Sequence, residues 1–294
     1  MLNKPESHWR TVRGEEMHFL RSGSGQTILF LHGYPEYSHT WSKVEPMLRP
    51  HFDLVMPDLQ GFGQSLSSVR GPSDQVDREA HAADMAALVD ELGIERFGIV
   101  SHDVGAYAAQ ELAYMMPKRI SGLFFFNCPY PGIGNRWLDP DYLKESWYQY
   151  FQQQPCAADI VGSSPDNIRK YMSHLLDRWS SKAGSFDDVM DDWVRNYSQP
   201  NALQGSFNWY RSNNRYRISM MRGQVVSRPP ISVRTCVRWG ADDLVAPAAW
   251  ADRMPEYFAD IDYAEFPGAG HFPHMERPVE SAAEIRKFFE TTQW

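Results

Sequence analysis

A carboxylate at the centre of a sharp turn is the first candidate for chemistry in this chain. Asp103 lies within residues 98–106 (GIVSHDVGA), where an apolar strand-like run passes directly into a helix-like one. Ser101 and Gly105 stand two positions before and after it, and such small residues let a strand and a helix approach closely. Because the turn lifts the central side chain clear of the sheet, the spacing predicts an exposed Asp nucleophile.

A candidate acid and a candidate base follow later in the chain. Asp242 and Asp243 come directly after the strand-like segment that ends at Gly240, and His271 lies in the glycine-flanked run 268–272 (GAGHF). The order nucleophile, acid, histidine is that of an α/β-hydrolase. We prefer Asp243 as the acid that orients His271, and we interpret Asp242 as a solvated loop residue.

The loop after the first buried strand supplies a candidate oxyanion hole. His32-Gly33-Tyr34-Pro35 ends the apolar run 27–31, and in this type of fold one backbone N–H of that loop faces the N–H that follows the nucleophile. Tyr34 and Val104 are therefore the expected donors. His32 is interpreted as a histidine held beneath this hole rather than as a base, and it is counted with Trp147 and Trp209 among the residues expected to contact substrate.

The elements that must position these residues alternate between strands and helices. Strands are expected at residues 16–21, 27–31, 52–56, 96–100, 120–126, 232–239 and 261–266, and helices at 78–92, 106–116, 247–258 and 278–291. This alternation predicts an α/β fold with a mostly parallel central sheet.

Between residues 130 and 222 the strand signal disappears. This segment is rich in Trp, Tyr, Gln and Asn and has helix-like pieces at 141–153, 165–176 and 186–197. We therefore expect a hydrolase core formed by residues 1–129 and 223–294, with an inserted helical cap at residues 130–222.

Composition excludes several functional classes. The chain has 294 residues and a net charge of −8, and no run of Lys or Arg stands out, so neither nucleic acid nor an anionic membrane is an expected partner. Its longest apolar runs are too short to span a bilayer. Cys128, Cys156 and Cys236 have neither disulfide nor zinc spacing. With no apolar stretch near the N-terminus, a cytoplasmic location is expected.

Neither a metal nor a cofactor is expected. His271 and His274 stand three residues apart, but Pro273 lies between them and no third ligand is near in the sequence. A homodimer that pairs through the exposed surface of the cap is left open.

Four motifs together resemble the α/β-hydrolase epoxide hydrolases and their dehalogenase relatives, over nearly the whole chain. They are residues 32–36 (HGYPE), 58–63 (DLQGFG), 102–105 (HDVG) and 270–271 (GH). Residues 208–211 (NWYR) resemble the epoxide hydrolase cap motif whose tyrosine protonates the epoxide oxygen, a role that falls on Tyr210. Residues 147–152 (WYQYFQ) resemble the segment with the second such tyrosine, for which Tyr148 is the better match and Tyr150 the alternative.

The resemblance implies a two-step hydrolysis of a small apolar electrophile, either an epoxide or an organohalide. Asp103 attacks carbon to form an alkyl-enzyme ester, while Tyr148 and Tyr210 assist the departing oxygen. His271, oriented by Asp243, then activates the water that hydrolyses the ester.

Departures from the dehalogenase patterns favour the epoxide. Haloalkane dehalogenases usually have Trp directly after the nucleophile, and fluoroacetate dehalogenases have Arg there and again three residues later, whereas this chain has Val104 and Tyr107. Where some relatives carry their acid, just after the strand at residues 120–126, this chain has Asn127, which leaves Asp242 or Asp243 on the later loop as the acid. A C–halogen hydrolase acting on haloacids or haloalkanes is the alternative. A non-catalytic ligand receptor is disfavoured, because every hydrolytic part is present.

Overall fold

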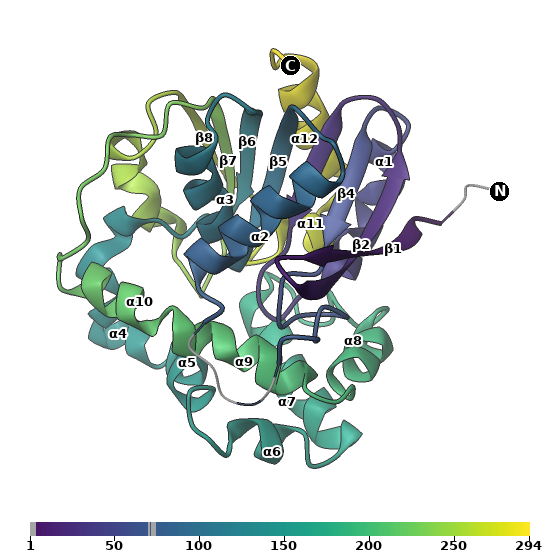
Figure 1. The fold of residues 1–294 in the computed structure, drawn as a ribbon. Helices are drawn as coiled ribbons and strands as arrows, with labels where there is room; N and C mark the ends of the chain where they lie inside the picture. Colours follow the sequence, from purple (N-terminus) through teal and green to yellow (C-terminus); the bar gives the residue numbers. More distant parts are fainter. Residues whose placement is uncertain (1–3, 70, 72–74) are drawn as a thin grey trace.

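The central sheet is built from strands whose side chains are apolar on both faces. The computed structural model describes residues 4–69, 71 and 75–294 (Figure 1). In β3 (Thr27–Leu31), Leu29 and Leu31 join one hydrophobic cluster, and Ile28 and Phe30 join another. Because successive strand residues point to opposite faces, this pattern requires a layer of helices on each side.

Eight strands form one sheet in the order β1-β2-β4-β3-β5-β6-β7-β8. The remaining strands are β1 (Glu6–Val12), β2 (Glu15–Gly23), β4 (Asp53–Pro57), β5 (Phe97–His102), β6 (Ile120–Phe126), β7 (Thr235–Gly240) and β8 (Ile261–Phe266). β2 is antiparallel to β1 and to β4, and all other neighbours are parallel. The parallel strands therefore end at one edge of the sheet, as the sequence predicts for the candidate residues.

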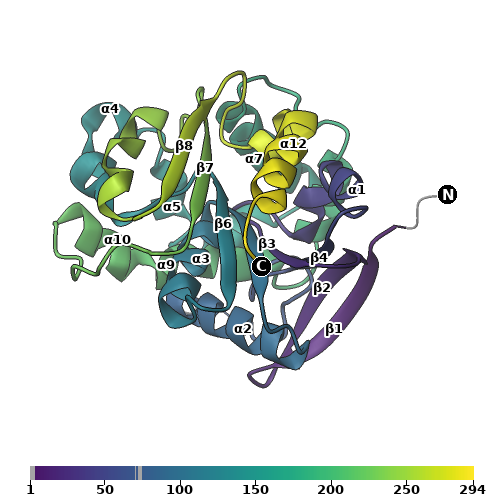
Figure 2. The same ribbon diagram turned by 90° about the horizontal axis from the view of Figure 1, so that it is seen from above.

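Helices cover both faces of this sheet, as Figures 1 and 2 show. α2 (Arg78–Glu91) and α3 (Val104–Met115) pack on one face, while α1 (Glu45–Leu48) and α12 (Pro278–Glu290) pack on the other. Two short elements, η1 (Ser38–Lys43) and α11 (Pro273–Glu276), follow the loops that carry Tyr34 and His271. The predicted α/β-hydrolase fold is confirmed.

All elements described between β6 and β7 are helical, and together we call them the helical insertion. They are η2 (Pro131–Leu138), α4 (Pro140–Leu143), α5 (Trp147–Phe151), α6 (Ala157–Val161), α7 (Pro165–Trp179), α8 (Met190–Tyr197), α9 (Ala202–Ser212) and α10 (Asn214–Met221). Gln152 donates a hydrogen bond to the Tyr34 hydroxyl, and Trp179 C=O accepts one from His271 N–H. The insertion thus lies over the loops that follow β3 and β8 (Figure 1).

Some local predictions differ from the structure. The helix expected at 141–153 is two short helices, because Glu145 and Ser146 form turns whose N–H groups bond three residues back. β1, α9 and α10 were not expected, and the segment expected as a helix at 247–258 is the 3₁₀ element η3 (Ala248–Glu256).

Two further expectations concern the boundaries of the helical cap and the absence of membrane-spanning helices. The division at 129/130 and 222/223 stays a prediction, since one hydrophobic cluster runs through both parts. Residues 1–3, on which part of the expectation of no leader rests, lie outside the described residues. None of the helices in the described part of the chain has the length and apolar character needed to cross a lipid bilayer.

Candidate active site

Asp103 occupies the predicted sharp turn between β5 and α3. Its backbone has φ 44° and ψ −108°, a conformation that residues other than glycine rarely adopt and that is typically strained by about 1–3 kcal/mol. Crowding enforces the turn: a Cβ on Gly105 would lie 2.3 Å from the Leu31 carbonyl oxygen, and one on Gly33 would lie 2.6 Å from the Asp103 Cβ. Only glycine fits at these two positions, so the turn and the Gly33 loop pack directly together.

One backbone donor reaches the Asp103 carboxylate. The Tyr34 N–H donates to Oδ2 at 3.1 Å. Val104, the other expected donor, is the first residue of α3, and the hydrogen bonds of the described residues do not include one from its N–H to Asp103. Among the described residues, Oδ2 accepts this hydrogen bond and none is found to Oδ1.

His271 pairs with Asp243 and not with Asp242. Its Nδ1 lies 3.0 Å from Asp243 Oδ2, and both side chains are buried. Asp243 Oδ1 accepts hydrogen bonds from the N–H groups of Val245 and Ala246, at 2.7 and 3.2 Å. Asp242 is exposed and accepts a hydrogen bond from Ser181. The loop after β7 therefore fixes Asp243 as the partner of the histidine.

The Asp243 pair also sets the charge and tautomer of His271. Burial alone would lower the pKa of His271, but the Asp243 carboxylate, helped by Asp103, outweighs burial and raises the pKa to about 9. With Nδ1 donating to Asp243, Nε2 is the nitrogen available for proton transfer.

Asn127 supports this pair from the end of β6. Its Nδ2 donates to Asp243 Oδ2 at 2.7 Å and to the Gly270 C=O at 3.2 Å, and its Oδ1 accepts from the Gly240 N–H. In the sequence, Asn127 was notable only because some relatives carry an acid at this position. In the fold it ties together the loops that carry Asp243 and His271.

A small cavity joins these residues to the helical insertion, and we call it the central cavity. It is lined by Asp103, Tyr107, Pro129, Trp137, Tyr148, Gln149, Trp209, Tyr210, Asn213, Arg217, Val245, Ala246 and His271. Its volume is about 30 Å³, enough for about two water molecules. A substrate larger than this requires side chains around it to move. Tyr107 also lines a second space, a hollow of about 1000 Å³.

Tyr148 and Tyr210 meet in the central cavity although they belong to different helices, α5 and α9. Their ring centroids are 5.5 Å apart. Gln149 Nε2 donates to the Tyr148 hydroxyl oxygen at 2.8 Å, which leaves the phenol proton of Tyr148 available. Burial, with further contributions from the Asp103 carboxylate, raises the pKa of both phenols, so both are neutral donors near pH 7. Tyr150, the alternative to Tyr148, is 44% exposed.

Of the three residues expected to contact substrate, Trp209 alone is among those that line the cavity. Trp147 is 40% exposed and packs against Tyr171 and His174, because the short α5 helix turns its neighbour Tyr148 inward instead. Trp147 thus lies outside the lining of the cavity, and its contact with substrate stays a prediction.

His32 is likewise not a lining residue. Its Nδ1 lies 2.9 Å from the Gly33 carbonyl oxygen, and its Nε2 accepts from the Leu59 N–H at 3.0 Å, so one neutral tautomer satisfies both bonds. Burial lowers its pKa and favours that neutral form. His32 links two loops, and its contact with substrate stays a prediction.

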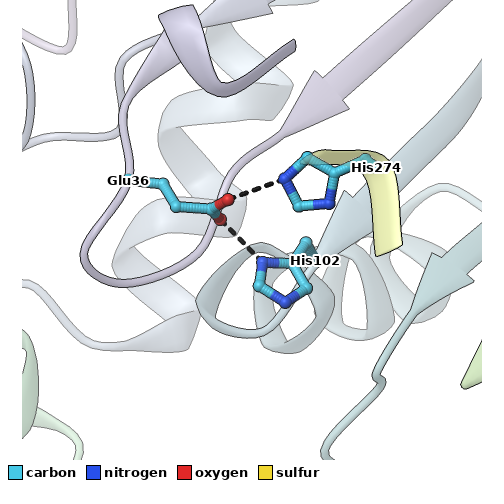
Figure 3. A group of neighbouring side chains, drawn as sticks. All are labelled: Glu36, His102 and His274. Carbon is cyan, nitrogen blue, oxygen red and sulfur yellow. Dashed lines mark hydrogen bonds and ion pairs between the residues drawn. The ribbon is translucent and has the colours of Figure 1, made fainter. Parts of the chain in front are cut away.

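Glu36, His102 and His274 form a second buried cluster, and Figure 3 shows their side chains. Glu36 bonds to His102 Nδ1 at 2.6 Å and to His274 Nε2 at 2.7 Å, and one ligand atom from each side chain lies within 4.8 Å of the other two. Burial opposes ionisation of Glu36, but the two histidine rings outweigh it and hold its pKa well below the ordinary value. In this structure the Glu36 carboxylate bonds directly to both histidine rings, so the atoms that could bind a metal ion are bonded to one another instead.

This cluster fixes the backbone around the candidate site. Glu36 Oε2 also accepts from the Gly33 N–H at 2.7 Å, and His102 Nε2 lies 2.7 Å from the His271 carbonyl oxygen. The loop carrying Tyr34, the strand before Asp103 and the loop carrying His271 are thereby held together.

Four polar residues of the site were not predicted from the sequence. Gln149, Asn213 and Arg217 line the central cavity, and Asn127 holds Asp243. A usable signal exists for two of them. Asn213 and Arg217 follow Tyr210 at spacings of three and seven, the spacing of one helical face, although in the structure Asn213 separates α9 from α10. Following that face onward from Tyr210 would have identified them.

Comparisons with known proteins agree with this architecture. A family model described as alpha/beta hydrolase fold matches residues 26–278. A fluoroacetate dehalogenase from Burkholderia sp. is 28% identical over 90% of this chain and 88% of its own length. A soluble epoxide hydrolase from Corynebacterium sp. strain C12 is 26% identical over 96% of each chain.

Solved structures show the same fold. The epoxide hydrolase CorEH without ligand superposes with a TM-score of 0.81 at 21% identity, over 98% of this chain and 99% of the other. The relatives carry epoxide hydrolase and dehalogenase names, and the family match extends over most of the chain. The chain therefore belongs to the alpha/beta hydrolase fold family and is a hydrolase of that family.

Proposed function

We propose that this hydrolase opens epoxides to vicinal diols and that the helical insertion acts as the cap of its active site. The observation that carries the proposal is the pair of buried, neutral tyrosines, Tyr148 and Tyr210, in the same cavity as Asp103. An epoxide oxygen leaves as an alkoxide, which is a far stronger base than a phenolate, so two phenol donors suit this leaving group.

In the first step Asp103 Oδ1 attacks a ring carbon of the epoxide. A C–O ester bond forms, the ring C–O bond breaks, and its electron pair goes to the ring oxygen. That oxygen takes a proton from Tyr148 or Tyr210, while the other phenol donates a hydrogen bond. The product is a hydroxyalkyl ester of Asp103 and one phenolate.

In the second step water attacks the ester carbonyl carbon, and His271 Nε2 takes the water proton. The oxyanion forms on Oδ2, to which the Tyr34 N–H already donates. When the ester C–O bond breaks, the departing diol oxygen takes the proton from His271. The proton left on the Asp103 carboxyl group returns to the phenolate, so one epoxide and one water give one diol.

Ester formation itself prepares His271 for this role. The Asp103 carboxylate is one of the groups that raise the pKa of His271 to about 9. Esterification removes that negative charge, so the pKa of His271 falls, which favours the neutral ring that the second step needs. Asp243, held by Asn127 and two backbone N–H groups, stabilises the imidazolium that forms next.

A C–halogen hydrolase with the same nucleophile and base remains the second candidate. The named activity of the Burkholderia relative favours it, and so does Arg217, which brings a cation to the central cavity that the sequence did not lead us to expect. A halide leaving group, however, does not need to be protonated, so this reaction gives no reason for two buried phenols.

The tyrosines give the test. We expect the wild-type protein to convert a panel of small epoxides to diols, and we expect Tyr210→Phe and Tyr148→Phe to lower kcat by about 100-fold or more, the scale of general acid catalysis. Tyr150→Phe is the matched control, since this exposed tyrosine lies two residues from Tyr148, and its rate should be unchanged. Halide release from haloacids, without turnover of any epoxide, would contradict the proposal.

A further inference from the structure

Arg217 is a buried cation that faces the central cavity without a counter-ion. It lies on α10, is 8% exposed, and lines the same cavity as Asp103 and Tyr148. Its Nε and Nη2 are buried and have no hydrogen-bond partner, and among the described residues no carboxylate forms an ion pair with it. Its charge acts on the cavity, because it lowers the pKa of Tyr148 against the larger effect of burial.

Two other partly or fully buried arginines, Arg238 and Arg78, are paired with carboxylates. Arg238 contacts Asp262 at 2.9 Å and Glu284 at 2.7 Å, and Arg78 contacts Glu111 at 2.9 Å. Arg217 instead has aromatic neighbours, with its Cζ 5.0 Å from the Tyr150 ring and 5.9 Å from the Trp137 ring. These rings hold the guanidinium in place but leave its buried N–H donors unsatisfied, and such donors are normally bonded.

Two neutral amides next to the same cavity are also incompletely bonded. Asn213 Oδ1, one helical turn before Arg217, and Gln149 Oε1, next to Tyr148, are buried and have no donor. Three side chains with spare hydrogen-bonding capacity therefore converge on the central cavity, in addition to the groups used in the two-step mechanism. This concentration points to a polar portion of the substrate.

We propose that the substrate carries a carboxylate, which pairs with the Arg217 guanidinium while Asp103 attacks the epoxide. This inference rests on the proposed epoxide hydrolysis and replaces the expected apolar electrophile with an epoxy acid. A planar carboxylate matches the guanidinium fork. One cation also balances its single negative charge, whereas a phosphate dianion would need a second cation. The pairing also offsets the repulsion between the substrate carboxylate and Asp103.

Glycidate and glycidamide provide the kinetic test, because they share one epoxide and differ in charge. We expect the wild-type protein to have the higher kcat/KM for glycidate. Arg217→Met should lower the ratio of the two kcat/KM values by about tenfold or more, since hydrogen bonds to charged groups lie on this scale. Arg217→Lys should keep part of the preference. Arg215→Met is the matched control, because Arg215 is exposed on the same helix, and the ratio should not change.

Binding to an unreactive probe separates this inference from the proposed function. Cyclopropanecarboxylate and cyclopropanecarboxamide copy the two substrates without the ring oxygen, and the Asp103→Asn background removes the repelling charge. Calorimetry should show tighter binding of the carboxylate, and this difference should be lost in Asp103→Asn/Arg217→Met. The melting temperature of each variant shows whether it is folded. The ratio of kcat/KM for glycidate to kcat/KM for glycidamide is also measured in the wild-type protein, where no substitution can disturb folding.

The outcomes are distinct. Arg217-dependent carboxylate binding without turnover of any epoxide would support the anion subsite while the proposed hydrolysis fails. Equal turnover of glycidate and glycidamide by the wild-type protein, with equal binding of the two probes, would overturn the carboxylate inference and leave epoxide hydrolysis standing. A ratio that is the same in the wild-type protein and Arg217→Met would also overturn it.

Discussion

Replacing Asp243 with Asn should remove a pH-dependent part of the folding free energy. In the folded protein Asp243 raises the pKa of the buried His271 to about 9, whereas an unfolded histidine titrates near 6.5. A raised pKa means that the folded state binds the proton more tightly. The resulting stabilisation is complete below about pH 6.5 and is lost as the pH rises through about 9.

The size of the effect follows from the two pKa values. The gap between 6.5 and about 9, at 1.36 kcal/mol per pH unit, corresponds to about 3 kcal/mol. In Asp243→Asn, burial is the dominant influence on His271, so its pKa should no longer be raised. The variant also loses hydrogen bonds, because the NH2 group of the introduced amide would face N–H donors of Asn127 and His271 where Asp243 now accepts. That loss does not depend on pH.

The assay is therefore a comparison across pH and not at one pH. Urea unfolding of the wild-type protein and of Asp243→Asn, from about pH 6 to about pH 10, should give stability differences that shrink by about 3 kcal/mol as the pH rises. Asp242→Asn is the control, since Asp242 is the exposed neighbour that does not touch His271. Parallel curves for the wild-type protein and Asp243→Asn, or an equal effect of Asp242→Asn, would refute the reasoning.

Two further predictions concern the walls of the site. Tyr107→Ala removes the side chain shared by the central cavity and the hollow of about 1000 Å³, so kcat/KM should rise for bulky epoxides relative to small ones; an unchanged size profile would contradict this. Gly105→Ala places a Cβ 2.3 Å from the Leu31 carbonyl oxygen and should destabilise the fold by about 1–3 kcal/mol, measured by urea unfolding; full stability would show that the turn can relax.

The positions of the three candidate residues Asp103, Asp243 and His271 were predictable from the sequence because their signals are local. Asp103 is marked by small residues at fixed offsets, and His271 by flanking glycines after a strand. Parallel strands then bring their ends to one edge whatever the details of packing. Asp243 was preferred over Asp242 on spacing alone, and the fold pairs His271 with Asp243.

The contributions of the helical insertion were harder to predict. In a segment rich in aromatic residues, inward and outward faces differ by one position, so Trp147 was expected at the substrate although Tyr148 is the residue that turns inward. Arg217 belongs to a helix that was not expected, and its unpaired state depends on which acids fail to reach it. Such an absence is a property of tertiary packing and has no local sequence signal.

The central claim is that Asp103 becomes esterified by an epoxide, and intact-mass measurement of His271→Gln tests it most directly. This variant lacks the base for the second step, so incubation with glycidate or another small epoxide should add the full mass of that epoxide, on the peptide that contains Asp103. The double variant Asp103→Asn/His271→Gln should show no addition. An unmodified His271→Gln protein after exposure to every epoxide that the wild-type protein hydrolyses, or an adduct that persists in the double variant, would contradict the claim.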